Sequence, residues 1–358
     1  MKSTVLVVGE KFRYSSDFLE ALKRKIHAKL PKIDSFVFIR ENDPNILVEL
    51  ENYIASSSNI IIAAQKNSFT LIGKMLSTHM LDTMVPRGDM LIPSKCKEYV
   101  SGSYLVTIQS RLINVLRIDT ASDIPNILIE EQRKIKKIFI LDNDEERTKL
   151  LVSPLAATSE IAATVYKNPS GFVELVAEEK KYGKLDSFLT KAQKLFDGKA
   201  IISDSLEAHI IASLSEQNKK LAIAESCTGG LLSYKFVRIP GASDVLIGSL
   251  TTYANEAKIS WLSVDENIID DYGAVSEESV SQMVDGLLKI SGADYAVAIS
   301  GVAGPGGGSA DKPVGLVYIG VGSLGGTKKI EKNIFFGDRE LIQSSAANYA
   351  LKMLCEIF

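Results

Sequence analysis

The sequence predicts an α/β protein with two three-layer α/β domains joined by a small α+β connector. Short continuous apolar runs alternate with amphipathic segments of helical period, as in "TVLVVG" (4–9) followed by "SSDFLEALKRKIHAKL" (15–30). Such runs are typical of parallel strands that helices cover on both faces. Glycine usage also divides the chain, because residues 201–358 hold eighteen of the 25 glycines. We therefore expect the tight loops in the C-terminal part.

The N-terminal domain is expected to span residues 1–145, and the connector residues 146–202. The predicted strands of the N-terminal domain are "TVLVVG", "SFVFI" (35–39), "NIIIAA" (59–64) and "KIFILD" (137–142). For the connector we predict a helix at "ATSEIAATVY" (157–166), a strand at "FVELVAEE" (172–179), a helix at "KLDSFLTKAQKLF" (184–196) and a short strand at "KAIIS" (199–203).

Residues 203–358 are expected to form the second α/β domain. The helix predicted at 276–291 has clear ends, because Ser276 can cap it, acidic residues occupy its first turn and Gly292 follows its last turn. The predicted strands are 220–225, 246–254, 294–300, 314–322 and 329–336, and the other helices are 204–217, 228–237 and 338–357.

Composition limits the class of protein and of ligand. A chain of 358 residues with 46% hydrophobic side chains can bury the cores of two or three domains. A formal charge of -3 without a basic block argues against nucleic acid or an anionic membrane surface as the main partner. The three cysteines, Cys96, Cys227 and Cys355, suggest neither a disulfide framework nor a paired-cysteine metal site. With no signal-peptide or membrane-spanning pattern, we expect a cytoplasmic protein with a small ligand.

Three loops of the second domain lie where ligands settle on α/β sheets. They are "ESCTGG" (225–230), "PGAS" (240–243) with the later "YANEAK" (253–258), and "SGVAGPGGGS" (300–309) with "KPVG" (312–315). In the third loop, backbone amides left bare by glycine can approach a phosphate closely, and Lys312 adds a point charge. The alternative is a flexible connection that merely tolerates glycine.

The loop "ESCTGG" has two interpretations. Ser226 or Thr228 could cap the next helix, with the glycines permitting close packing. Alternatively, the helix N-terminus and the loop amides polarise a carbonyl or hold an anion. Cys227 could be a thiolate at the helix start, but without a histidine to accept its proton we interpret it as a packed small residue.

A serine nucleophile in this domain needs a base other than histidine. Only His27, His79 and His209 exist, and a Ser/His/Asp triad would have to use His209 on an amphipathic helix. The known substitute is a lysine that burial keeps neutral. Lys258 is the candidate, and its alternative is a solvated helix lysine.

Together these segments resemble one family. The motifs "AESCTGG", "PGAS" followed by "TYANEAK", "GAVSEE", "SGVAGPGGGS" with "KPVG", and "GDR" occur in the order and spacing of the CinA C-terminal domain, the nicotinamide mononucleotide deamidase family. The match covers nearly all of residues 205–358. It implies hydrolysis of the carboxamide of nicotinamide mononucleotide to nicotinate mononucleotide and ammonia, within pyridine nucleotide salvage, without a metal or a cofactor.

The resemblance also implies roles for individual residues. In that family the serine of a serine–lysine dyad precedes the lysine of the "NEAK" box by fifteen positions, which implies Ser243 as nucleophile and Lys258 as its base. Tyr253 is implied as a hydrogen-bond partner of the dyad, and loop amides as the oxyanion donors. We further expect a nucleotide substrate and a homodimer. The implied substrate-binding residues are Ser226, Thr228, Gly229, Ser300, Gly301, Gly304, Gly306, Gly307, Lys312 and Arg339.

The N-terminal half resembles the molybdopterin-cofactor-binding-like domain of the same family, which is associated with metal-dependent ADP-ribose pyrophosphatase activity. Members carry a glycine-rich loop, a threonine and paired aspartates after their third apolar run. Here "QKNSFTLIGKML" (65–76) follows "NIIIAA", with one glycine, Gly73, and no acid. We therefore expect a degenerate scaffold. The alternative functions are a non-catalytic nucleotide-binding or interaction protein and residual pyrophosphatase activity.

Overall fold

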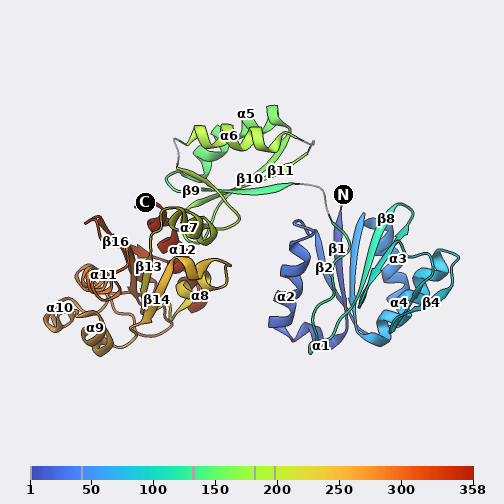
Figure 1. Ribbon diagram of the computed structural model, residues 1–358, viewed down its shortest axis with the longest axis horizontal. Coiled ribbons are helices and arrows are strands. Elements are labelled where there is room, and N and C mark those ends of the chain that lie inside the picture. Colours follow the sequence, from blue (N-terminus) through green and yellow to red (C-terminus); the bar gives the residue numbers. More distant parts are fainter. Residues whose placement is uncertain (1, 42, 131–133, 181–182, 197–198) are drawn as a thin grey trace. The chain divides into compact units, whose positions relative to one another are not determined.

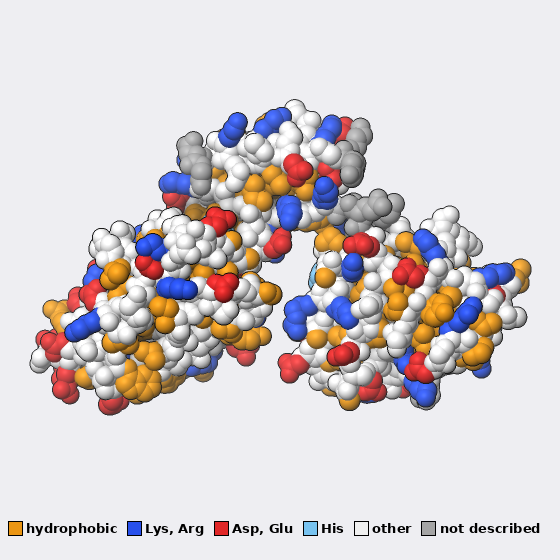
Figure 2. Space-filling model, in the orientation of Figure 1, with side chains coloured by type: hydrophobic (Ala, Val, Ile, Leu, Met, Phe, Trp, Pro, Cys, Tyr) orange, Lys and Arg blue, Asp and Glu red, His pale blue; other side chains and the backbone are white. Residues whose placement is uncertain are grey.

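Both α/β domains contain a group of neighbouring parallel strands, as the alternation of apolar runs and helices predicts. The computed structural model describes residues 2–41, 43–130, 134–180, 183–196 and 199–358. Residues 1–132 and 133–358 form two separate units (Figure 1), and the second contains both the connector and the C-terminal domain. On the visible surface, acidic and basic side chains are interspersed (Figure 2).

The N-terminal unit is built on a six-stranded sheet of order β2-β1-β3-β8-β7-β6. β2, β1, β3 and β8 are parallel, and β7 and β6 continue the sheet antiparallel. Helix α2 covers one face, and α3 and α4 cover the other (Figure 1). The elements are β1 (Ser3–Val8), α1 (Glu10–Arg13), α2 (Ser16–His27), β2 (Ser35–Ile39), α3 (Ile46–Ser56), β3 (Asn59–Ala64), α4 (Lys66–His79), the hairpin β4 (Met84–Arg87) and β5 (Met90–Pro93), β6 (Glu98–Val100), β7 (Ser103–Ile108) and β8 (Arg111–Arg117).

The segment "KIFILD" does not belong to the N-terminal sheet, so that prediction was wrong. It contributes to β9 (Ile135–Ile140), which pairs antiparallel with β11 (Val173–Glu179) and β12 (Ala200–Ile202). The resulting connector sheet has the order β10-β11-β9-β12. The connector therefore takes up a strand that lies before residue 146.

The prediction of a helix at "ATSEIAATVY" was also wrong for most of that segment. Helix α5 (Glu145–Ser159) is followed by Glu160, whose left-handed φ of 56° ends the helix. Strand β10 (Ile161–Lys167) follows directly. β10 pairs with β11 along its full length, and this pairing overrides the helix propensity of its alanines. The other predicted helix and the short strand of the connector are confirmed as α6 (Leu185–Leu195) and β12.

The C-terminal domain has a five-stranded sheet of order β14-β13-β15-β16-β17, and every strand predicted for it is confirmed. β14, β13 and β15 are parallel, whereas β16 and β17 are antiparallel to their neighbours. Helices α7, α8 and α12 cover one face, and α9, α10 and α11 cover the other (Figure 1). The elements are α7 (Leu206–Glu216), β13 (Leu221–Glu225), α8 (Leu231–Val237), η1 (Ala242–Asp244), β14 (Leu246–Thr251), α9 (Asn255–Leu262), α10 (Glu266–Tyr272), α11 (Glu277–Ser291), β15 (Tyr295–Gly301), β16 (Leu316–Ser323), β17 (Lys328–Ile334) and α12 (Arg339–Cys355).

Local signals in the sequence set the ends of α11 as predicted. The Ser276 hydroxyl accepts a hydrogen bond from the Ser279 backbone N–H, and Gly292 ends the helix with a φ of 65°. Four buried apolar residues of the connector join the core on the α7 side of the C-terminal sheet: Phe139, Leu141, Phe172 and Ile201. In the part of the chain that the structure describes, no helix is both long and apolar enough to cross a membrane.

Candidate functional site

A cavity of about 490 Å³ opens at the carboxyl edge of the C-terminal sheet. Ser226 directly follows β13, Lys258 lies on α9 after β14, and Ser300 lies near the end of β15. Because these three strands are parallel neighbours, the segments that follow them converge at one edge. The predicted site residues that line the cavity are Ser226, Tyr253, Lys258, Ser300, Gly301, Gly304, Gly306, Gly307 and Arg339.

Lys258 is buried, with 1% of its surface exposed, and its ammonium faces oxygen atoms. Nζ donates to Ser226 Oγ at 3.2 Å, to the Thr252 carbonyl at 2.8 Å and to the Tyr253 carbonyl at 3.2 Å. Burial lowers the pKa of the Lys258 amine below its ordinary value. A neutral amine can give its two N–H groups to the carbonyls and direct its lone pair at the Ser226 hydroxyl.

The predicted pair of Ser243 and Lys258 is not formed, and this prediction was wrong. Ser243 is exposed on η1, before β14, and it lines a different hollow with Pro240 and Leu246. Lys258 follows the other end of the six-residue strand β14. At about 3.3 Å per residue, the strand keeps the two residues roughly 15–20 Å apart. Ser226 is the serine that contacts the lysine.

The Tyr253 side chain contacts an arginine and not the serine–lysine pair. Its hydroxyl accepts a hydrogen bond from Arg339 Nη2 at 3.2 Å, while Arg339 Nη1 donates to the Gly304 carbonyl at 2.6 Å. Only the backbone carbonyl of Tyr253 reaches Lys258. The exposed guanidinium of Arg339 keeps further N–H donors for a ligand.

Glu225 performs the capping role that the sequence offered to Ser226 or Thr228. Its fully buried carboxylate accepts hydrogen bonds from the backbone N–H groups of Gly230 at 3.2 Å, Leu232 at 2.9 Å and Ser233 at 2.8 Å. It also accepts from the Ser233 hydroxyl. The first turn of α8 is therefore satisfied by a strand residue, which leaves Ser226 Oγ to Lys258.

The turn after Ser226 presents two backbone donors. Ser226 N–H donates to the Ile299 carbonyl at 2.9 Å, and Gly229 N–H donates to the Ser226 carbonyl at 3.1 Å. Across the described residues, no backbone carbonyl accepts a hydrogen bond from the N–H groups of Cys227 and Thr228. Burial raises the pKa of the Cys227 thiol to about 12, so this side chain is protonated at neutral pH and packs as a small apolar group.

The glycine-rich loop forms a wall of the cavity. Two of its glycines, Gly301 and Gly306, have different surroundings. A Cβ at Gly301 would lie 2.6 Å from the Leu316 carbonyl oxygen, so close packing demands glycine there. At Gly306 no atom lies within 4 Å of the Cβ position, so protein packing does not explain that glycine. The Ser300 hydroxyl donates to the Ala274 carbonyl at 2.7 Å.

Three predicted substrate-binding residues do not line the cavity: Thr228, Gly229 and Lys312. The Lys312 ammonium donates to the Tyr272 carbonyl. Asn255, the first residue of α9, does line the cavity, and our sequence reasoning missed it. Its signal was present, since it stands in the same "NEAK" box as Lys258.

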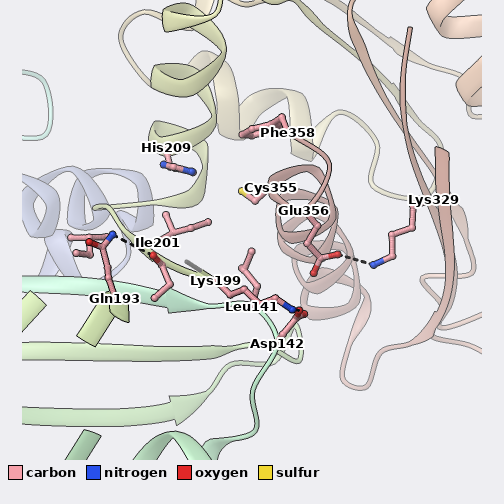
Figure 3. Close-up of a pocket in the computed structure, with 12 residues that line it drawn as sticks. Leu141, Asp142, Gln193, Lys199, Ile201, His209, Lys329, Cys355, Glu356 and Phe358 are labelled. Carbon is pink, nitrogen blue, oxygen red and sulfur yellow. Dashed lines mark hydrogen bonds and ion pairs between the residues drawn. The ribbon is translucent and has the colours of Figure 1, made fainter. Parts of the chain in front are cut away.

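A second cavity, of about 620 Å³, lies where the connector meets the C-terminal domain (Figure 3). Its charged side chains neutralise one another, because Lys199 pairs with Asp142 and Lys329 pairs with Glu356. His209 faces this cavity, and burial lowers its pKa. Within the described ranges, no group of three or more His, Cys, Asp or Glu residues is arranged to hold a metal ion. The cavity with Ser226 and Lys258 is therefore the better candidate for chemistry.

The C-terminal part of the chain matches known proteins. The family model described as CinA C-terminal domain matches residues 203–358. A CinA-like protein of Syntrophomonas wolfei is 45% identical over 152 residues, which cover 42% of this chain and 36% of that protein. A CinA-like protein of Thermotoga neapolitana is 47% identical over 151 residues, again 42% of this chain and 36% of that protein. The match thus spans little more than a third of these relatives.

Solved structures match the same region. The competence/damage inducible protein CihA from Agrobacterium tumefaciens is 38% identical, and the match covers 42% of this chain and 92% of that chain, with a TM-score of 0.41. A competence damage-inducible protein from Klebsiella pneumoniae is 34% identical over 94% of its chain, with the same TM-score of 0.41. Through its C-terminal domain, residues 203–358, the chain belongs to the CinA family.

Proposed function

We propose that the C-terminal domain is an amidohydrolase that converts nicotinamide mononucleotide to nicotinate mononucleotide and ammonia, with Ser226 as nucleophile and Lys258 as its base. The contact of 3.2 Å between Lys258 Nζ and Ser226 Oγ carries the proposal. A buried lysine with a lowered pKa can accept the proton of a serine that would otherwise be a weak nucleophile. Membership in the CinA family and the motifs of its deamidase domain support the choice of substrate.

The chemistry follows from these two side chains. Lys258 takes the proton of Ser226 Oγ, and the oxygen attacks the carboxamide carbon to form a tetrahedral oxyanion. When the oxyanion collapses, the C–N bond breaks and the leaving nitrogen takes the proton from the Lys258 ammonium, which releases ammonia. Water then gives a proton to Lys258 and attacks the ester carbonyl, so that nicotinate mononucleotide leaves and Ser226 Oγ regains its hydrogen.

The surroundings of the pair suit such a reaction. Cys227 lines the cavity, and its N–H and the N–H of Thr228, at the other end of the Cys227–Thr228 peptide, lie next to the nucleophile, where they can stabilise an oxyanion. A cavity of about 490 Å³ is large enough for a mononucleotide. The guanidinium of Arg339 supplies donors for a phosphate at the cavity wall.

Release of ammonia from nicotinamide mononucleotide by the purified full chain tests the proposal. We expect turnover by the wild type, a loss of roughly three orders of magnitude or more in Ser226→Ala, and near wild-type turnover in Ser243→Ala. Activity in Ser226→Ala together with loss in a folded Ser243→Ala would return the nucleophile to η1. Binding of the nucleotide by the wild type without any turnover would favour the non-catalytic alternative.

For the N-terminal domain we propose a scaffold without pyrophosphatase activity. Gln65, which precedes α4, forms no side-chain cap with this helix, and the first turn of α4 contains no acid. We expect ADP-ribose to stay intact with magnesium or manganese. Metal-dependent hydrolysis that is lost on substitution of residues 65–68 would contradict this.

A further inference from the structure

Gln343 ties helix α12 to the turn that carries the nucleophile. Its side-chain Nε2 donates to the backbone carbonyl of Cys227 at 2.7 Å, across 116 positions of sequence. Gln343 is half-buried one turn after Arg339, on the helix whose first residue lines the cavity. One side chain of α12 therefore holds the backbone of the turn, while another contacts the glycine-rich loop.

The bond to the Cys227 carbonyl fixes more than that oxygen. The peptide unit is planar, and in a trans peptide its C=O and N–H point in opposite directions. A carbonyl held by Gln343 therefore fixes the direction of the Thr228 N–H at the other side of the same peptide. The preceding peptide is fixed in the same way, because Gly229 N–H holds the Ser226 carbonyl and so directs the Cys227 N–H.

Both of these N–H groups belong to the turn that follows Ser226, and neither donates to a backbone carbonyl among the described residues. Thr228 is 3% exposed, and its hydroxyl oxygen Oγ1 is likewise buried without a partner. Buried polar groups without partners are rare in folded proteins and concentrate where function requires them. Donors held in place before the reaction starts stabilise an oxyanion better than donors that must first reorient.

We propose that Gln343 is a positioning residue, which orients the Cys227–Thr228 peptide as an oxyanion donor for Ser226. The inference rests on the proposed function, in that it assigns the oxyanion donors of the same site. Gln343 itself does not touch the substrate in this proposal. Its effect should therefore appear in the rate of the chemical step and not in substrate affinity.

The test compares Gln343→Glu with the wild type in the full chain. Glutamate has nearly the same shape, but its ionised carboxylate cannot donate and repels the Cys227 carbonyl. We expect kcat to fall by about tenfold to a hundredfold while KM stays within about twofold. Gln217→Glu, on an exposed glutamine at the end of α7, is the matched control and should leave both constants unchanged. Gln343→Ala, which also removes the donor, carries the test if the glutamate variant does not fold.

Two measurements that do not depend on the substrate show whether a negative result contradicts the role of Gln343 or the assigned substrate. A fluorophosphonate probe labels a reactive serine by using the oxyanion donors for its phosphoryl oxygen, and its rate of reaction with Ser226 should fall in parallel with kcat. The ¹⁵N–¹H resonance of Thr228 should shift in Gln343→Glu at unchanged Tm. Wild-type kcat and unchanged labelling in Gln343→Glu would overturn the inference. A third outcome would overturn the assigned substrate alone. In it, the probe labels the wild type rapidly and Gln343→Glu slowly, yet the wild type releases no ammonia.

Discussion

Ser226 and Lys258 lie 3.2 Å apart because each follows the carboxyl end of one of two neighbouring parallel strands. Thirty-one residues separate them in the sequence, including the whole of α8 and β14. The sheet brings them together, and burial of the lysine amine then makes the contact chemically useful.

The pH dependence of turnover should report the lowered pKa of Lys258. Because only the neutral amine can accept the serine proton, kcat/KM should rise with pH through an apparent pKa below 10.5, the ordinary value for lysine. Initial rates between about pH 6 and pH 10 measure this profile. Lys258→Arg, which keeps the charge but cannot lose its proton, should be inactive throughout. A rate that is flat across this range, or an active arginine variant, would contradict the assignment.

The same lowered pKa affects stability. Between the folded-state pKa of Lys258 and 10.5, the unfolded chain binds more protons than the folded one. The free energy of unfolding of the wild type should therefore rise with pH across this window, relative to Lys258→Met, which cannot titrate. Urea unfolding at several pH values gives both curves, and parallel curves would show that burial does not shift this amine.

Glu225 should matter more for stability than its position in a strand suggests. Glu225→Gln replaces a carboxylate that accepts four hydrogen bonds by an amide that cannot accept them all. We expect a loss of about 1.5–3 kcal/mol in the free energy of unfolding, measured by urea denaturation. Glu216→Gln, on an exposed glutamate of α7, should stay within about 0.5 kcal/mol. Equal effects of the two substitutions would show that the buried bonds contribute little.

Cys227 should be dispensable for catalysis although it lines the cavity next to Ser226. With its thiol pKa raised to about 12, only about one thiol in ten thousand is ionised at pH 8. Iodoacetamide at that pH should leave activity intact, and Cys227→Ala should retain turnover. Rapid inactivation that is abolished in Cys227→Ala, with the substrate protecting the wild type, would instead mark the thiol as reactive.

Residues 203–358 alone should retain deamidase activity, because every group assigned to the reaction lies within them. The fragment lacks Phe139, Leu141, Phe172 and Ile201 of the connector, which are buried in the core on the α7 side. Its Tm should therefore fall below that of a 134–358 fragment, while kcat stays within about twofold. Loss of turnover in a folded short fragment would show that the connector contributes to the site.

The sequence predicted the elements of the C-terminal domain well, because apolar runs, glycines and the Ser276 cap are local signals. It failed where the outcome depends on a distant partner. Nothing within "KIFILD" says which sheet it joins, and the alanines of β10 favour a helix until β11 pairs with them. The predicted contact between Ser243 and Lys258 failed for a related reason. Counting fifteen positions back from Lys258 ignores that Ser243 stands at the amino end of β14 and Lys258 beyond its carboxyl end.

The choice of Ser226 could have been reached from topology. A residue directly after a buried parallel strand lies at the ligand-binding edge, whereas one directly before a strand lies at the opposite edge. The roles of Glu225 and Gln343 could not have been predicted in this way. Glu225 sits in a strand without the usual sequence of a cap, and Gln343 reaches the turn from a helix 116 positions away.

The carboxylate of Glu225 lies at the start of α8, where it accepts hydrogen bonds from backbone N–H groups. Strand–turn–helix corners commonly hold a phosphate at the helix N-terminus, where free N–H groups and the helix dipole attract an anion. In this chain a negative group of the protein already occupies that position at α8. A mononucleotide is therefore expected to enter with its neutral carboxamide toward the Ser226 turn and its phosphate toward Arg339. In the proposed reaction, the buried Glu225 carboxylate would thus favour one orientation of the ligand before any reaction begins.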